Sequence, residues 1–161
     1  MKTIRTIIIA ALGALAACSP ATTELEDYTG YVNVRIGSGG HGHVFVGASV
    51  PFGAVQLGPT SIPQQWDWCS GYHSSDSTVI GFSHTHLSGT GCCDLGDVLI
   101  MPTVGEQDIT QEEERGQTKA YASAFSHERE KAEPGYYSVM LDRYGIQAEI
   151  TSTTRGAIHR W

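Results

Sequence analysis

QAEITST, residues 147–153, alternates in the period-2 manner of a half-exposed β-strand, with every second side chain on one face. Further strands are predicted over residues 136–141 and, in shorter pieces, over 44–46, 54–57, 78–83 and 97–101. Turn residues such as Pro51-Phe52-Gly53 and 19 glycines, many of them in clusters, favour short strands over helices. Residues 111–115 have a helix-like composition but are charged and lack an apolar stripe, so a solvated loop or hairpin arm is expected there. The pattern predicts an all-β fold, an antiparallel β-sandwich.

The first residues have the pattern of an export signal. Lys2 and Arg5 precede an unbroken run of apolar and small residues over 7–17, too short to span a bilayer. The run ends in Leu15-Ala16-Ala17-Cys18, which resembles a bacterial lipobox, in which Cys18 is lipidated and becomes the mature N-terminus. An ordinary signal peptide cut nearby is the alternative. We therefore expect a signal peptide over residues 1–17, a tether over 18–30 and one domain over 31–161.

Charge and the residue after Cys18 bear on location and partners. Ser19 rather than Asp favours sorting of the lipoprotein to the outer membrane of a Gram-negative bacterium. The formal net charge is −7, and it becomes more negative when the basic signal is removed. An acidic chain lacks the basic face that neutralises phosphates, so nucleic acid is not an expected partner. One expected partner is a membrane, reached through the anchor at Cys18.

The cysteines and the C-terminus leave alternatives open. Cys69, Cys92 and Cys93 are an odd number for an oxidising compartment. One disulfide from Cys69 to either of the others is possible, since vicinal cysteines rarely bridge each other. The chain stops at Trp161 directly after a strand-like run, which would leave a sheet edge unpaired. A truncated chain is expected, with a genuine C-terminus in an edge strand as the alternative.

A glycine-rich stretch, GSGGHGH over residues 37–43, is the first cluster with chemical potential. Glycines let the backbone approach a ligand closely, and adjacent amides can cradle an anion or a hydroxyl. The stretch does not match a phosphate-binding loop, and no helix pattern follows it. The alternative is a tight turn that carries two solvated histidines, His41 and His43.

WDWCSGYH, residues 66–73, is the second cluster. Indole faces suit the apolar C–H face of a sugar ring, and Asp and His suit its hydroxyls, so the mixture fits a polar ligand in a partly apolar pocket. The alternative places one tryptophan in the core and the other on the surface. Nucleophilic catalysis by Cys69 is conceivable, but nothing identifies a partner that would orient it.

GFSHTHLSGTGCCD, residues 81–94, is the third cluster. In a strand, His84 and His86 would point to the same face, as a metal pair requires. Together with His41, His43 and either Asp94 or Asp97, a zinc site can be imagined, which would make the protein a small zinc hydrolase. The sequence contains neither H-E-x-x-H nor C-x-x-C, and vicinal Cys92 and Cys93 have the wrong spacing for one tetrahedral site. We predict no metal ligands in this chain.

In this order the stretches resemble the N-terminal domain of glycoside hydrolase family 92, the calcium-dependent exo-acting α-mannosidases. The resemblance runs from about Tyr31 to the last residue, and a lipoprotein signal is also typical of the family. The matching residues are Tyr31-Val32-Asn33, 36–43, Gly47-Ala48, Val50-Pro51-Phe52-Gly53, Val55-Gln56-Leu57, Trp66-Asp67, Cys69-Ser70-Gly71-Tyr72-His73, 81–91 and Asp94-Leu95-Gly96-Asp97. GSGGHGH and GFSHTHLSGTG together are highly specific.

The resemblance implies a two-part enzyme that removes terminal α-mannose from N-glycans or mannan. Its N-terminal part is a β-sandwich similar to the galactose mutarotase-like fold. A C-terminal (α/α)6 barrel supplies the general acid, the general base and most of the calcium site. Inverting hydrolysis needs two carboxyl groups about 6.5–9.5 Å apart, with a water between them. No catalytic residue is therefore expected in this chain, which should be inactive alone; the acidic residues 112–114 are expected to be solvated.

Site residues are carried over from the resemblance as substrate-binding residues. Trp66 is expected to be the platform for the sugar in the leaving-group subsite, with Gly42 as a close backbone approach beside it. Asp67, Cys69, His84 and His86 match family motifs and are expected to line or support the pocket; His84 and His86 bracing a loop is the alternative. The departures from the family pattern, Val34-Arg35, Val46, Trp68 and Cys93, bear on leaving-group specificity. A free-standing carbohydrate-binding lipoprotein without hydrolase activity is the competing hypothesis.

Overall fold

A computed structural model describes residues 26–62, 65–93, 95–107, 109 and 120–161. Its strands are β1 (Gly58–Thr60), β2 (Thr78–Val79), β3 (Gly81–Ser83), β4 (Ser123–Ala124), β5 (Glu130–Glu133), β6 (Tyr136–Leu141), β7 (Ile146–Ser152) and β8 (Ala157–Arg160). The helical segments of this part are short 3₁₀ turns, η1 (Thr29–Tyr31), η2 (Trp66–Trp68) and η3 (His127–Arg129). Every pairing between the described strands is antiparallel. The all-β, antiparallel prediction is therefore confirmed.

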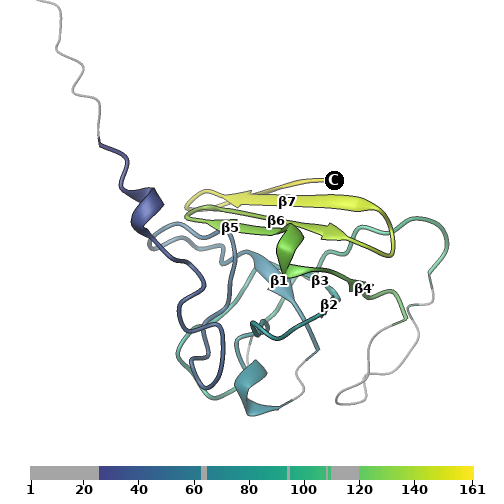
Figure 1. Cartoon of the computed structure of the whole chain (residues 1–161), viewed down its shortest axis with the longest axis horizontal. Helices are drawn as coiled ribbons and strands as arrows, with labels where there is room; N and C mark the ends of the chain where they lie inside the picture. The colour runs from purple at the N-terminus through teal and green to yellow at the C-terminus, as the bar shows by residue number, and fades with distance from the viewer. Residues whose placement is uncertain (1–25, 63–64, 94, 108, 110–119) are drawn as a thin grey trace, which may run out of the picture.

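A four-stranded meander, in the order β5-β6-β7-β8, forms one layer of the molecule. The second layer lies beneath it and consists of the pairs β1-β3 and β2-β4 with the loops that carry them, as Figure 1 shows. Short turns join consecutive strands of the meander: residues 134–135 lie between β5 and β6, and Gly135 there has a φ of +74°. Glycine adopts such a φ without strain, whereas other residues do not. Glycine at position 135 therefore favours a tight turn between β5 and β6.

The core lies between the two layers. On the inner face of the meander, Tyr137 is opposite Ile150 and Val139 is opposite Ala148. These side chains pack on residues of the second layer, among them Leu57 and Phe82, and all of them are at most 1% exposed. Burial of a large apolar side chain contributes about 1.5–3 kcal/mol. Successive side chains of β7 therefore point in turn to this core and to the outer face, and this is the period of two that the sequence shows.

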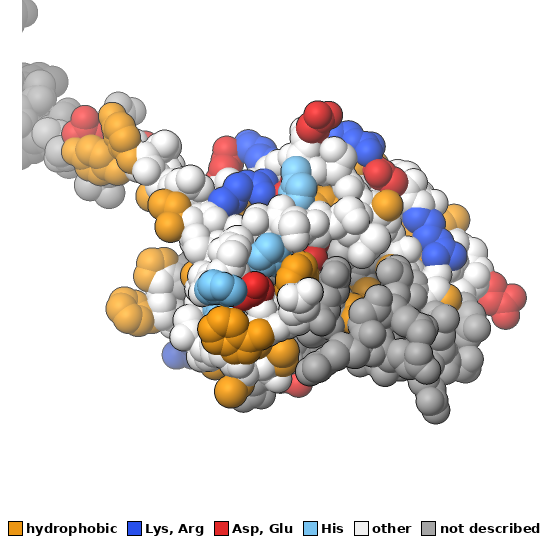
Figure 2. All heavy atoms as spheres, turned by 60° about the horizontal axis from the view of Figure 1, so that its bottom comes forward, with side chains coloured by type: hydrophobic (Ala, Val, Ile, Leu, Met, Phe, Trp, Pro, Cys, Tyr) orange, Lys and Arg blue, Asp and Glu red, His pale blue; other side chains and the backbone are white. Residues whose placement is uncertain are grey.

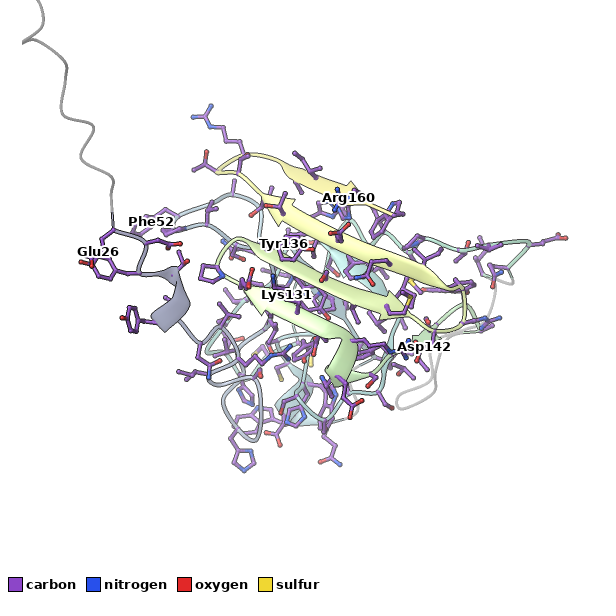
Figure 3. The ribbon with its side chains drawn as sticks, turned by 45° about the horizontal axis from the view of Figure 1, so that its top comes forward. Glu26, Phe52, Lys131, Tyr136, Asp142 and Arg160 are labelled. Carbon is purple, nitrogen blue, oxygen red and sulfur yellow. The ribbon has the colours of Figure 1, made fainter. Side chains whose placement is uncertain are left out.

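The outer face of the meander is polar. Glu149 accepts a hydrogen bond from the Tyr136 hydroxyl at 2.7 Å and two from the Arg160 guanidinium at 2.5 and 2.7 Å. The ammonium of Lys131 lies 5.6 Å from the centre of the Tyr136 ring. The bonds from Arg160, with that from Tyr136, hold the pKa of Glu149 at about 2. Figure 3 shows Lys131, Tyr136 and Arg160 on this face.

A buried carboxylate joins the N-terminal segment to the meander. The side chain of Glu130, at the start of β5, has no exposed surface and lies 2.7 Å from the Arg35 guanidinium. It also accepts hydrogen bonds from the hydroxyls of Tyr137 at 2.7 Å and Tyr72 at 3.0 Å, and His127 Nδ1 lies 2.7 Å away. Arg35, noted above as a departure from the family pattern, thus acquires a structural role as the partner of this carboxylate.

Three predicted strands need correction. Residues 44–46 do not form a strand, and of 54–57 only Leu57 pairs, through an isolated bridge to Ala48. A Cβ on Gly47 would lie 2.1 Å from the Leu57 carbonyl oxygen, so the two segments cross in close contact instead of running as a ladder. Of 97–101 only Ile100 pairs, with Phe82, because Val98 has a φ of +52°, which interrupts an extended chain.

The predictions for residues 136–141, which are β6, and for 147–153, which correspond to β7 at 146–152, are confirmed. The single strand predicted over 78–83 is instead divided at Ile80 into β2 and β3, which belong to different sheets. Some predictions lie outside the described residues. These are the signal peptide, Cys18, most of the tether, Asp94 as a possible zinc ligand, and the loop or hairpin arm at 111–115. Among the residues that the structure does describe, no helix is long and apolar enough to cross a membrane.

Candidate functional site: the Trp66 face

The glycine-rich loop at residues 37–43 folds back tightly on itself. Gly37 has a φ of +83°, and its carbonyl accepts a hydrogen bond from the Val44 amide at 3.1 Å. Gly42 passes directly over Gly37: a Cβ on Gly42 would lie 2.1 Å from the Gly37 carbonyl oxygen. The loop is also tied to a second loop, because the Gly89 amide donates to the His43 carbonyl at 2.7 Å. Glycine at position 42 is therefore a steric requirement of the loop that presents His41 and His43.

Gly42→Ala should lower the free energy of unfolding by about 1–3 kcal/mol, the usual cost of forcing an extra carbon into a packed site. The loop must open to admit the methyl group, because the obstructing atoms belong to the Gly37 backbone. Urea unfolding monitored by tryptophan fluorescence measures the change. Gly30→Ala is the matched control, since a Cβ at Gly30 meets nothing within 4 Å. Equal midpoints for the two variants would contradict the close approach at Gly42.

Asp67 lies between the two histidines of the loop. Its Oδ1 atom is 2.6 Å from His41 Nδ1 and 3.6 Å from His43 Nε2. The hydrogen bond with His41 is the main cause that lowers the pKa of Asp67. The His41 side chain is open to solvent, whereas that of His43 is only 6% exposed, with its Nε2 lacking a hydrogen-bond partner among the described residues. The result is an ionised carboxylate with an imidazole on either side.

Trp66 presents an exposed indole beside this group. It is 57% exposed, yet its Nε1 donates to the Gly91 carbonyl at 3.0 Å, and its ring and that of His43 are nearly perpendicular with centroids 4.1 Å apart. A Cβ on Gly91 would lie 2.6 Å from Nε1, so the loop approaches the indole as closely as a glycine allows. We call Trp66, Asp67, His41, His43 and Gly91 the Trp66 face. In Figure 2 histidine, acidic and hydrophobic side chains gather on the face turned to the viewer.

The rest of residues 66–73 turns inward. Trp68 is 9% exposed, donates to Asp76 at 2.6 Å and stacks on His73, and Tyr72 is 1% exposed. The expectation of one tryptophan in the core and one on the surface therefore describes the pair. The burial of Trp68 leaves Trp66 as a candidate binding residue. An aromatic side chain that is exposed and held in one orientation can serve as a platform for a ligand.

Cys69 and His86 lie behind the face, on the wall of a hollow of about 300 Å³ that Cys93 also lines. Burial raises the pKa of the Cys69 thiol to about 11, which makes it a poor nucleophile. His86 is 5% exposed, with Nδ1 2.7 Å from the Gln56 carbonyl, Nε2 3.2 Å from the Thr60 hydroxyl and its ring stacked on Phe45. Burial also lowers the pKa of His86, so a neutral imidazole braces the loop.

His84 and His86 do not share a face. Strand β3 ends at Ser83, before either residue, so the strand spacing no longer applies to their side chains. His84 places Nδ1 2.7 Å from the Val98 carbonyl and Nε2 3.0 Å from Nε2 of His159. These contacts agree with the alternative given for both residues, in which His84 and His86 brace a loop through hydrogen bonds. His84 and His159 were not foreseen as neighbours, because 75 positions separate them.

The imagined zinc site does not fit this arrangement. His41 and His43 contact Asp67, while His84 and His86 are each engaged elsewhere. Within the described ranges no group of three His, Cys, Asp or Glu side chains is placed to hold a metal ion. The same holds for the calcium ion that the family resemblance implies: these described residues offer no such group of ligands. No reaction step at a metal ion is therefore assigned to them.

Comparison with known proteins identifies the relatives. Residues 31–161 match the model of the glycosyl hydrolase family 92 N-terminal domain. A family GH92 α-mannosidase from Bacteroides thetaiotaomicron superposes with a TM-score of 0.75 at 42% identity, covering 83% of this chain and 18% of that one. The GH92 glycosyl hydrolase ccman5 gives a TM-score of 0.68 at 32% identity, with the same coverages of 83% and 18%.

Two further relatives agree with these matches. A GH92 inverting mannosidase from Bacteroides thetaiotaomicron gives a TM-score of 0.60 at 27% identity, covering 84% of this chain and 18% of that one. An uncharacterized secreted glycosidase from Arthroderma benhamiae is 30% identical over 151 residues, which are 93% of this chain and 19% of that protein. The chain thus spans about one fifth of the length of the relatives it matches.

Proposed function

Since the chain belongs to glycoside hydrolase family 92 through its N-terminal domain, we propose that it supplies the substrate-binding N-terminal part of an inverting α-mannosidase. The reaction is removal of terminal α-mannose from N-glycans or mannan. The relatives support this assignment, since they include an α-mannosidase and an inverting mannosidase. The catalytic carboxylates and the calcium site belong, in this proposal, to the C-terminal part of the longer protein.

The single observation that carries the proposal is the fixed, exposed indole of Trp66 beside Asp67. An indole face packs against the C–H face of a sugar ring, and the flanking carboxylate and imidazole can bind its hydroxyls. The Gly91 hydrogen bond holds the indole in one orientation, so little side-chain entropy is lost when a sugar binds. We assign the sugar on the leaving-group side of the scissile bond to this face, with Gly42 as the close backbone approach beside it.

Three of the described carboxylates support a binding or structural role over a catalytic one. Asp67 is held between His41 and His43, Glu130 is buried in its network with Arg35, and Asp76 accepts from Trp68 and the His73 amide. Inversion needs an acid and a base about 6.5–9.5 Å apart across a water. Each of these three carboxylates has a protein partner that a general acid or base would have to give up.

The chain alone should release no mannose from a synthetic aryl α-mannoside, whereas the longer protein should release it. Purified chain and longer protein, at equal molar concentration and with calcium present, are compared by the release of the aryl group. Release by the chain alone above the buffer rate would contradict the division of roles. Sequencing the gene past the codon for Trp161 separates this proposal from a free-standing carbohydrate-binding lipoprotein.

We also propose export and lipid anchoring through Cys18 to the outer membrane. The support is the Leu15-Ala16-Ala17-Cys18 pattern after an apolar run, and the relative that is named a secreted glycosidase. Labelled palmitate fed to cells that express the protein should be incorporated, and Cys18→Ala should abolish the incorporation. Equal labelling of both proteins would contradict an anchor at this residue.

A further inference from the structure

Two cysteines meet behind the Trp66 face. Cys69 caps the C-terminus of η2 and is buried, and Cys93 lies on the loop that follows Gly91. Their Sγ atoms are 3.5 Å apart, which is a direct contact between two thiols. Cys92, the neighbouring residue, is exposed. Of the two partners that the sequence leaves open for Cys69, the fold brings Cys93 into contact with it.

The same two segments are already joined at the binding face. The Gly91 carbonyl accepts the hydrogen bond from Trp66 Nε1, two residues before Cys93, and Trp66 is three residues before Cys69. A covalent bond between Cys69 and Cys93 would therefore join η2 to the loop at residues 89–93 next to that hydrogen bond. Only small movements are needed, because the sulfur atoms already touch.

We propose that Cys69 and Cys93 form a disulfide when the protein meets a disulfide oxidant, and that this bond fixes the loop that holds Trp66. The proposal names a modification site and goes beyond sugar binding. It stands whether or not the Trp66 face binds mannosides, because it rests on the contact of the two thiols.

The reaction proceeds by two thiol–disulfide exchanges. The thiolate of exposed Cys93 attacks one sulfur of the oxidant, forming a mixed disulfide and releasing one oxidant thiol. The Cys69 thiolate then attacks the Cys93 sulfur of that mixed disulfide and releases the second oxidant thiol. Two protein thiols lose two protons and two electrons, and the oxidant disulfide gains them. Cys92 remains a free thiol.

Exposure and acidity set the order of these steps. Cys93 is open to a bulky oxidant, whereas Cys69 is buried. Burial and the neighbouring thiol raise the pKa of Cys69 to about 11, so little of it is ionised near neutral pH. Cys69 is therefore the second nucleophile, and the closing step should become faster as the pH rises from 7 to 9.

The test is a peptide map after incubation of the full chain with oxidised glutathione. Cleavage before aspartate, with free thiols alkylated and no reductant, places Cys69 in residues 67–75, Cys92 and Cys93 in residues 76–93, and Cys18 in residues 1–26. The expected product is residues 67–75 joined to 76–93, with one cysteine alkylated. Its mass should be lower by two hydrogen atoms than the sum of residues 67–75 with a free thiol and residues 76–93 with one alkylated cysteine. A reductant should separate the two peptides.

Two serine variants identify the partner of Cys69. Cys92→Ser should retain the joined peptides after oxidation, and Cys93→Ser should lose them. Recovery from oxidised wild type of separate peptides, with residues 67–75 alkylated once and residues 76–93 alkylated twice, would overturn the proposal. Joined peptides that persist in Cys93→Ser and vanish in Cys92→Ser would overturn it as well, since Cys92 would then be the partner. None of these outcomes depends on sugar binding, so they leave the proposed function untouched.

Discussion

Glu130→Ala should destabilise the folded chain by about 3–5 kcal/mol, because it removes a buried carboxylate that several donors share and leaves those donors without an acceptor. The change leaves the Arg35 guanidinium without its carboxylate and deprives the hydroxyls of Tyr72 and Tyr137 of their acceptor. Because Arg35 comes from the N-terminal segment and Tyr137 from β6, both layers lose an anchor. Urea unfolding followed by tryptophan fluorescence measures the loss.

A matched pair of milder variants tests whether burial is the cause. Glu130→Gln and Glu149→Gln remove the same charge from the same sheet, but Glu149 lies on the polar outer face with Arg160. Glu130→Gln should shift the urea midpoint clearly, and Glu149→Gln should leave it close to wild type, because an exposed pair contributes little. Equal shifts for the two variants would contradict the role assigned to the Glu130 network.

The Glu130 network also makes stability depend on pH. Burial opposes ionisation of Glu130, but hydrogen bonds from Tyr137, His127 and Arg35 outweigh it and lower the pKa below the usual 4.5. The unfolded chain therefore binds the proton more tightly than the folded one. The stabilisation is fully present above about pH 4.5 and is lost as the pH falls through the lowered pKa. The urea midpoint of Glu130→Gln should accordingly fall less on acidification than that of the wild type.

The sequence predicts the meander better than the second layer, for a physical reason. β7 is long enough to show a period of two, with one face buried against the core, and β6 is a continuous run of six mostly apolar residues. In the second layer, strands of two or three residues are fixed by contacts with distant segments, such as the bridge between Ala48 and Leu57. A local pattern carries no information about such contacts, and nothing in the sequence around Val98 signals its left-handed φ.

The candidate site was predictable in its parts and not in its geometry. Composition indicates that Trp66 and Asp67 suit a sugar, and the family resemblance adds Gly42. The contacts that position them join residues 25 or 26 places apart, Trp66 to Gly91 and Asp67 to His41. The one feature of the sequence that points to these contacts is the glycine at positions 42 and 91. A Cβ at Gly42 would collide with the Gly37 backbone, and a Cβ at Gly91 would collide with the Trp66 indole.

Trp66→Ala should weaken use of a substrate whose leaving group is a sugar by about 30-fold in kcat/KM, equivalent to about 2 kcal/mol, the usual size for an aromatic side chain that becomes buried on binding. The residue is 57% exposed in the free chain, so its removal takes little from the core. The urea midpoint should therefore stay close to that of the wild type. Tyr31→Ala, which removes another exposed aromatic ring outside the Trp66 face, should leave kcat/KM unchanged.

The most direct test of the Trp66 face compares two substrates in the longer protein. One is an α-linked mannose disaccharide, and the other is α-mannosyl fluoride, whose leaving group offers no ring to an indole. Trp66→Ala should lower kcat/KM for the disaccharide by about 30-fold and leave that for the fluoride within about twofold. Equal losses for both substrates, or no loss for either, would contradict the assignment of the leaving-group sugar to Trp66.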